Sequence, residues 1–84
     1  MFYTYILRLS TGRYYIGFSS CLQYRVSAHM NGLVTQTKNC RPLKLAFYAA
    51  FVSKKKALDF ETYLKTNSGF AFRNKRLISP LPML

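Results

Sequence analysis

Three polar side chains on two predicted helices are of types that could act in phosphodiester chemistry. Arg25 and His29 are four residues apart, so they share one face of a helix. Glu61 lies at the edge of the apolar stripe of a later helix, in a chain with only two acidic residues. Arg25 could stabilise the charge of a phosphorane, and His29 or a tyrosine could deprotonate water. Each also has a purely structural alternative: a surface arginine, a packed histidine and a Glu61–Lys65 helical ion pair.

The residue inventory excludes several other mechanisms. A two-metal phosphodiesterase needs several carboxylates, and the chain has only Asp59 and Glu61. Acid–base cleavage by a pair of histidines is excluded because the chain has one histidine, and a serine triad would have weak acidic support. One hard cation held by Glu61, with mostly water as its other ligands, remains compatible with the composition and suits Mg²⁺ or Mn²⁺.

The charge of the chain points to a polyanionic partner. Thirteen Lys and Arg against two acids give a formal net charge of +11 over 84 residues. A field of this sign attracts nucleic acid, and an anionic membrane surface is the weaker alternative. Lys54, Lys55 and Lys56 open a predicted helix, where cations oppose the helix dipole. Phosphate contact therefore explains them better than helix formation does, with a merely solvated face as the alternative.

The remaining composition indicates a chain of the cytoplasm. No apolar run approaches the roughly 20 residues that span a bilayer, and the first residues lack the pattern of a signal peptide. Cys21 and Cys40 are expected to be ordinary thiols, because one histidine and no CxxC pattern leave a zinc site without ligands. The sequence leaves the oligomeric state open, with a monomer as one option.

The elements that must position these residues can be predicted from local patterns. Strands are expected over 2–9, 13–18 and 43–52, the last covered on both faces because it barely alternates. Helices are expected over 21–31, capped by Ser19 or Ser20 and closed by Gly32, over 54–67, capped by Ser53, and over 70–77, after a break at Ser68 and Gly69.

The order of these elements is ββαβαα. It predicts an α+β domain with a three-stranded antiparallel sheet flanked by three helices. A basic stretch over 33–42 is long enough to form a mobile loop. The domain is expected to cover residues 1–78, and residues 79–84 are expected to form a C-terminal tail.

Taken in order, these residues resemble the GIY-YIG nuclease superfamily. Thr-Tyr-Ile at 4–6 and Tyr-Ile-Gly at 15–17 stand for the two name-giving motifs, followed by Arg25, His29 and Glu61 on successive helices. The resemblance covers residues 2–77. The stretches ALDFETYLK and SGFAF are similar to those of small single-domain bacterial members, which are related to the nuclease domain of the excision-repair incision enzyme. Each motif is weak alone, but the ordered set is specific.

The resemblance implies a role for each of five residues. Tyr5 and Tyr15 would be paired active-site tyrosines, one of which orients or deprotonates the attacking water. Arg25 would contact the scissile phosphate, and His29 would assist proton transfer or positioning. Glu61 would be the sole protein ligand of one divalent metal ion, Mg²⁺ or Mn²⁺. The residues alone do not decide which of Tyr5, Tyr15 and His29 is the base.

The chain also departs from the family pattern. The first motif reads TYI in place of GIY, although its tyrosine is kept. Phe18 stands where some relatives have a lysine after the glycine, so that phosphate contact is missing or comes from elsewhere. Asn74 is the nearest candidate for the asparagine that many relatives carry about one helix after the glutamate. No additional DNA-binding domain is expected.

A parity argument tests the shared site without reference to the family. If Tyr5 and Tyr15 lie on one face, paired residues of the hairpin must have numbers with an even sum, such as Leu7 with Tyr15. This predicts a three-residue connection over 10–12 with a positive φ at Gly12. Tyr14 would then pack on the opposite layer, and Gly17 would keep the neighbouring surface open to a phosphate backbone.

The predicted function is metal-dependent hydrolysis of DNA phosphodiester bonds; a structure-specific substrate in repair or recombination is one form of it. The alternatives are a non-catalytic, basic nucleic-acid-binding module and a ribosome-associated or membrane-surface protein. The cations expected to contact DNA are Lys38, Arg41, Lys44, Lys54, Lys55, Lys56, Arg73, Lys75 and Arg76.

Overall fold

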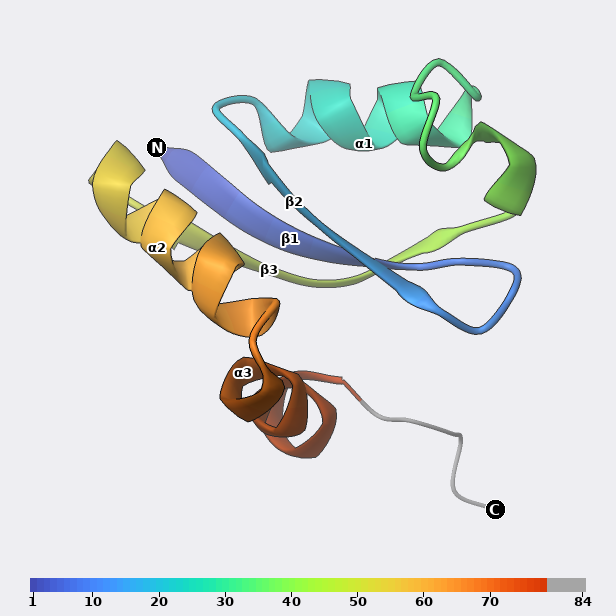
Figure 1. The fold of residues 1–84 in the computed structure, drawn as a ribbon. Coiled ribbons are helices and arrows are strands. Elements are labelled where there is room, and N and C mark those ends of the chain that lie inside the picture. Colours follow the sequence, from blue (N-terminus) through green and yellow to red (C-terminus); the bar gives the residue numbers. More distant parts are fainter. Residues whose placement is uncertain (79–84) are drawn as a thin grey trace.

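The fold is one antiparallel sheet with helices on both of its faces. The computed structural model describes residues 1–78, and the predicted tail over 79–84 lies outside the described residues. The strands are β1 (Phe2–Arg8), β2 (Tyr14–Ser19) and β3 (Lys44–Phe51), in the spatial order β2-β1-β3. The helix α1 (Leu22–Met30) covers one face, and α2 (Lys54–Leu64) and α3 (Asn67–Phe72) lie on the other (Figure 1). The predicted ββαβαα order is confirmed.

The β1–β2 hairpin has the predicted three-residue connection. Leu7 pairs with Tyr15, and the Leu9 N–H donates to the Arg13 carbonyl at 2.8 Å, which leaves residues 10–12 as the turn. Gly12 has a φ of 87°, the left-handed conformation that glycine adopts without a steric cost. The hairpin therefore places Tyr5 and Tyr15 on the same face of the sheet.

Helix α1 begins without a side-chain cap, in contrast to the prediction of a serine cap. The residue before its first turn is Cys21, whose N–H donates to the Ser19 hydroxyl at 3.0 Å, so Ser19 forms a local turn and does not bond the helix. Gly32, with a φ of 76°, follows the helix as predicted. The segment after it packs against the domain: Val34 and Thr37 are buried, and a short 3₁₀ turn spans Lys38–Cys40.

The third strand is an edge strand, and the prediction that both its faces are covered is wrong. Only β1 pairs with it, and Leu45 and Tyr48 are exposed on its α1 side because that helix lies over β1 and β2. One extra residue, Ala46, forms an irregularity opposite Ile6 and Leu7. This irregularity disrupts the alternation of side chains, which is why the sequence did not show a half-buried pattern.

The C-terminal helices divide three residues earlier than predicted. The Ser53 hydroxyl caps α2 by accepting from the Lys56 N–H at 3.3 Å, as expected. Thr66, and not Ser68 or Gly69, separates the helices: its hydroxyl accepts from the Gly69 N–H at 3.1 Å and caps α3. A π-helical turn over Arg73–Leu77 continues α3.

The core consists of two apolar clusters, one on each face of the sheet. Toward α1, Tyr5, Leu7 and Leu43 pack with Leu22 and Tyr15. Toward α2, the sheet residues Ile6 and Ile16 pack with Leu64, and Tyr14 joins them there. Tyr14 thus packs on the layer opposite to Tyr15, as the parity argument predicts. No helix within residues 1–78 is long and apolar enough to cross a membrane.

Candidate active site

A buried chain of hydrogen bonds joins β1, α1 and the turn after α1. The Tyr5 hydroxyl lies 2.9 Å from His29 Nε2, and His29 Nδ1 lies 2.8 Å from the Thr37 hydroxyl. All three side chains are almost completely buried, with Tyr5 1% exposed and the other two 0%. The histidine therefore has a partner on each ring nitrogen, which fixes its orientation.

The electrostatics of this network keep both Tyr5 and His29 neutral near pH 7. Burial raises the pKa of Tyr5 above its ordinary value, although the Arg25 guanidinium opposes part of the increase. Burial lowers the pKa of His29, and the charge of Arg25 lowers it further. A neutral His29 can accept from the Tyr5 hydroxyl and donate to Thr37, so every group of the network is satisfied.

Arg25 lies beside both predicted tyrosines. Hydrogen bonding to Tyr5 and the charges of Tyr5 and Tyr15 raise the pKa of Arg25. The ring centroids of Tyr5 and Tyr15 are 6.4 Å apart, and that of Tyr15 is 5.0 Å from that of His29. The structure therefore brings the two tyrosines, Arg25 and His29 together, and their catalytic roles stay predictions. A guanidinium in this position would stabilise a tyrosinate.

Gly17, the glycine of the second motif, does not keep the neighbouring surface open as predicted. Gly17 is buried and pairs with Tyr5 across the hairpin. A Cβ on Gly17 would lie 2.9 Å from Tyr5 Cε2 and closer still to the Cζ and hydroxyl oxygen. The space beside Gly17 is thus filled by the Tyr5 ring and is not left open to a phosphate.

Glu61 and Tyr15 line one open depression between β2 and α2. The depression has a volume of about 510 Å³ and also contains Gln36 and Lys65. The Glu61 side chain is 20% exposed, and its Oε2 lies 3.2 Å from Lys65 Nζ, which is the helical ion pair considered from the sequence. Tyr5 and His29 do not line the depression, whereas Tyr15, whose ring packs against both, does.

The donor set of this depression fits one hydrated cation. The described residues contain no group of three His, Cys, Asp or Glu side chains able to hold a metal. Mg²⁺, however, prefers oxygen ligands and keeps several waters, so one accessible carboxylate is a sufficient protein ligand. Lys65 is 56% exposed and can turn into solvent, which would release Glu61 to a cation.

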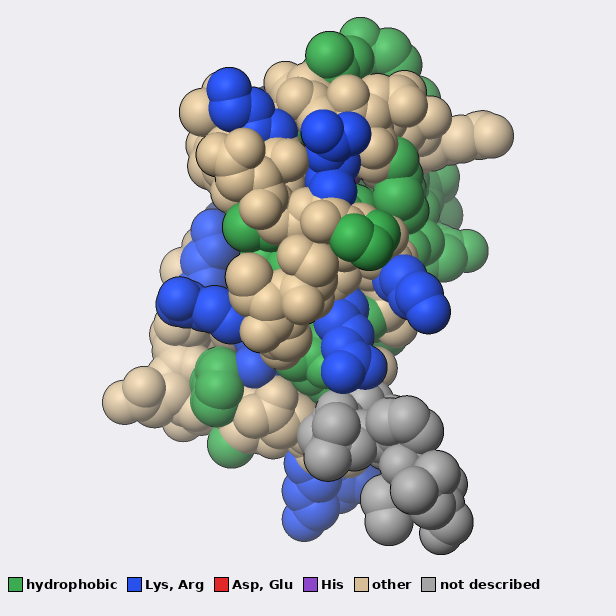
Figure 2. All heavy atoms as spheres, turned by 90° about the vertical axis from the view of Figure 1, so that its right-hand side faces the viewer, with side chains coloured by type: hydrophobic (Ala, Val, Ile, Leu, Met, Phe, Trp, Pro, Cys, Tyr) green, Lys and Arg blue, Asp and Glu red, His purple; other side chains and the backbone are tan. Residues whose placement is uncertain are grey.

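The predicted DNA-binding cations lie on several elements and are exposed, with one exception. Figure 2 shows a face on which Lys and Arg side chains lie at several levels and no acidic side chain is visible. Lys55 is bonded to Asp59 at 2.8 Å. Arg73 is the exception, because it is 7% exposed and donates from Nε and Nη2 to Asn74 Oδ1. Asn74 thus interacts with Arg73 and not with Glu61. The exposed cations are Lys38, Arg41, Lys44, Lys54, Lys55, Lys56, Lys75 and Arg76.

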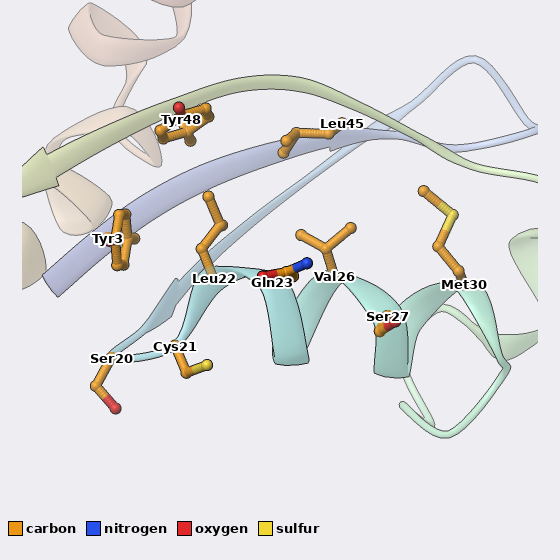
Figure 3. Close-up of a pocket in the computed structure, with 10 residues that line it drawn as sticks. All are labelled: Tyr3, Ser20, Cys21, Leu22, Gln23, Val26, Ser27, Met30, Leu45 and Tyr48. Atoms are coloured by element: carbon orange, nitrogen blue, oxygen red, sulfur yellow. The ribbon is translucent and has the colours of Figure 1, made fainter. Parts of the chain in front are cut away.

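A second concavity, between α1 and the exposed face of β3, contains none of the predicted site residues. It has a volume of about 610 Å³, and Leu22, Val26 and Met30 of α1 point across it toward the sheet (Figure 3). Leu45 and Tyr48 line the opposite wall. Its lining carries no Lys, Arg, Asp or Glu, so it offers no charged side chain to a phosphate or a cation.

Two residues near the site were missed by sequence reasoning. Thr37 completes the hydrogen bonds of His29, and Gln36 lines the depression beside Glu61. Both lie in the segment over 33–42, which has no regular periodicity. The one available signal was the pair of polar residues, Gln36 and Thr37, next to Val34, which is buried.

Comparison with known proteins identifies the family of the chain. The model of the GIY-YIG catalytic domain matches residues 1–76, nearly the whole chain. The chain belongs to the GIY-YIG family. This is a family of nuclease domains. No solved structure matches the chain.

The relatives of this GIY-YIG domain include several small bacterial proteins. A UPF0213 protein of Streptococcus pneumoniae is 34% identical over 64 residues, which are 75% of this chain and 65% of that protein. One of Clostridium perfringens is 35% identical over 66 residues, covering 77% of this chain and 71% of the relative. One of Staphylococcus saprophyticus is 34% identical over 76 residues, covering 89% and 88%. The matched part thus spans just under two thirds of the Streptococcus protein.

Proposed function

We propose that this GIY-YIG domain is an endonuclease that hydrolyses DNA phosphodiester bonds with the help of one divalent metal ion. The observation that carries the proposal is the common depression of Tyr15 and Glu61, with Arg25 next to Tyr15. A possible base and a metal-binding carboxylate therefore share one depression that is open to solvent, and Arg25 lies beside Tyr15 without lining that depression.

We assign the role of base to Tyr15 and a positioning role to Tyr5 and His29. Tyr15 lines the depression and lies beside Arg25, so it is the tyrosine placed to take a proton from water. Tyr5 is buried, has a raised pKa and is bonded to His29, so it is poorly placed to meet water. A Mg²⁺ or Mn²⁺ ion on Glu61 would supply charge stabilisation at the leaving oxygen when bound.

The exposed cations supply the attraction to DNA in this proposal. The lysines at the start of α2 and the cations of the turn after α1 are exposed and, apart from Lys55, have no carboxylate partner among the described residues. Contacts of this kind release counterions, so binding should weaken steeply with added salt. A cytoplasmic location and a role in repair or recombination stay predictions from the sequence.

The test compares two carboxylate substitutions in the same helix. We expect Glu61→Gln to lower Mg²⁺- or Mn²⁺-dependent cleavage of plasmid, single-stranded and branched DNA about 100-fold or more while DNA binding is retained. Asp59→Asn is the matched control, because Asp59 is exposed and bonds only Lys55, and it should cleave like the wild type. Equal activity of Glu61→Gln and the wild type would refute the metal site.

A second pair of variants separates the two tyrosines. Tyr15→Phe removes the proposed base and should abolish cleavage, whereas Tyr5→Phe removes one hydrogen bond to His29 and should leave a measurable rate. The reverse order would assign the base to Tyr5. If the wild type binds DNA but cleaves none of the three substrates, the alternative function as a non-catalytic binding module is supported.

A further inference from the structure

Arg73 is buried, although the sequence predicted it as one of the cations that contact DNA. Its guanidinium carbon lies 4.2 Å from the ring centroid of Phe70 and 4.9 Å from that of Tyr14, so it contacts both aromatic rings. Asn74 Oδ1 accepts from its Nε at 3.1 Å and from its Nη2 at 3.0 Å. Among the described residues, Nη1 has no hydrogen-bond partner.

The charge of Arg73 has no counterion within residues 1–78. The acidic residues Asp59 and Glu61 are each paired with a lysine on α2, at 2.8 and 3.2 Å. Burying a cation costs free energy unless an anion or hydrogen bonds compensate the lost hydration. One amide oxygen and two aromatic faces compensate only part of this cost for Arg73. An anionic ligand would supply the remainder.

The free nitrogen of Arg73 faces solvent and not the core. No buried side-chain nitrogen or oxygen of the described residues lacks a hydrogen-bond partner. Because Nη1 has none, it must reach solvent, and Arg73 lines the two depressions on either side of it. The guanidinium thus offers N–H donors from a fixed position, which is the geometry that binds a phosphate.

The two depressions are neighbours along one groove. The first is the candidate active site with Glu61 and Tyr15, and the second, of about 570 Å³, contains Arg13 from the hairpin turn. Both are lined by Tyr14, Phe70 and Arg73. A DNA strand whose phosphate is at Glu61 could therefore place an adjoining phosphate at Arg73.

Phe70 adds an aromatic surface to this groove. Its ring is 52% exposed, although Arg73 covers one face. An exposed ring beside a phosphate-binding arginine is typical of sites for unpaired nucleotides, because a base inside a duplex is already stacked on its neighbours.

We propose that the groove formed by Tyr14, Phe70 and Arg73 binds an unpaired nucleotide next to the cleaved phosphate, with its phosphate on Arg73 and its base on Phe70. This inference rests on the proposed nuclease function and adds its substrate class: DNA with a single-stranded interruption beside the cleavage position. Duplex DNA would contact the exposed cations but leave this groove empty.

The test measures binding and not cleavage, so that it stays informative if the chain cuts no DNA. Fluorescence anisotropy in the presence of EDTA compares a duplex, the same duplex with a short single-stranded gap, and the same gap with abasic nucleotides. We expect the wild type to prefer the gapped duplex about five- to 150-fold, the range for one base stacked on an aromatic side chain. The abasic gap should lose this preference.

Three variants assign the preference to the groove. Phe70→Leu keeps an apolar side chain but removes the ring, and it should bind gapped and intact duplex equally. Arg73→Gln should weaken gapped DNA selectively and reduce the salt dependence of its binding by about one phosphate contact. Arg76→Gln removes the same charge from the exposed surface, and it should weaken both DNAs to a similar extent.

Two results would overturn the proposal: a preference that survives in Phe70→Leu, or an Arg73→Gln variant that weakens both DNAs equally. Thermal unfolding checks that each variant is folded. If Arg73→Gln is not, Arg73→Lys keeps the charge and removes the planar donors, and Phe70→Leu decides the question independently. If the wild type cleaves no DNA but still prefers the gapped duplex, the nuclease function is rejected and the binding role of the groove is supported.

Discussion

The packing of Gly17 against Tyr5 predicts a large cost for adding a single methyl group. The hairpin pairs these residues, and a Cβ at Gly17 would overlap the end of the Tyr5 ring. The ring cannot turn away without breaking its 2.9 Å hydrogen bond to His29. Overpacking of this kind costs about 1–3 kcal/mol, and a Gly-to-Ala change at a compatible backbone returns about 0.4–1 kcal/mol.

Gly17→Ala should therefore destabilise the fold by about 1–2 kcal/mol in net terms, or about 4–16 °C in melting temperature for a domain of this size. The expected cause is the clash and not the backbone, because positive φ values occur at Gly12 and Gly32 and not at Gly17. Cleavage measured well below the melting temperature should also fall, since Tyr5 and His29 would move together.

A double-mutant cycle with Tyr5→Leu isolates this clash. Leucine is too short to reach the Gly17 position, so Gly17→Ala in the Tyr5→Leu background should be neutral or stabilising by up to about 1 kcal/mol. Urea unfolding at equilibrium gives the four free energies. An equal loss of stability in both backgrounds would show that the cost does not come from the Tyr5 ring.

Three further predictions concern stability. Thr37→Val leaves His29 Nδ1 without its buried partner and should cost about 1–3 kcal/mol in urea unfolding, whereas Thr35→Val, on the exposed surface of the same turn, should change little. Because the pKa of His29 is lowered in the folded state, the unfolded chain binds more protons below its ordinary pKa of about 6.5. The stability contribution of His29 is thus complete above about pH 6.5 and declines as the pH falls toward the folded-state pKa, and a free energy of unfolding independent of pH over this window would contradict it. Gly69→Ala should destabilise despite the better helix propensity of alanine, since a Cβ would lie 2.6 Å from the Tyr63 carbonyl carbon, and a raised melting temperature would contradict this.

Local patterns were sufficient where a residue's neighbours along the chain set its position. The parity of the hairpin put Tyr5 and Tyr15 on one face, and helical spacing put Arg25 and His29 together. The limits of α2 and α3 were predicted less well, because the break was placed at Ser68 and Gly69, whereas Thr66 caps α3 and Gly69 lies inside that helix, packed against the Tyr63 backbone.

Local sequence patterns were enough to predict the element order, the turn and the set of residues that could act on a phosphodiester. The contacts of Thr37 with His29, of Gly17 with Tyr5 and of Arg73 with two aromatic rings became known from the folded structure alone. The physical reason is the range of the interactions. Periodicity reports the neighbours of a residue along the chain, whereas these contacts depend on how separate elements pack.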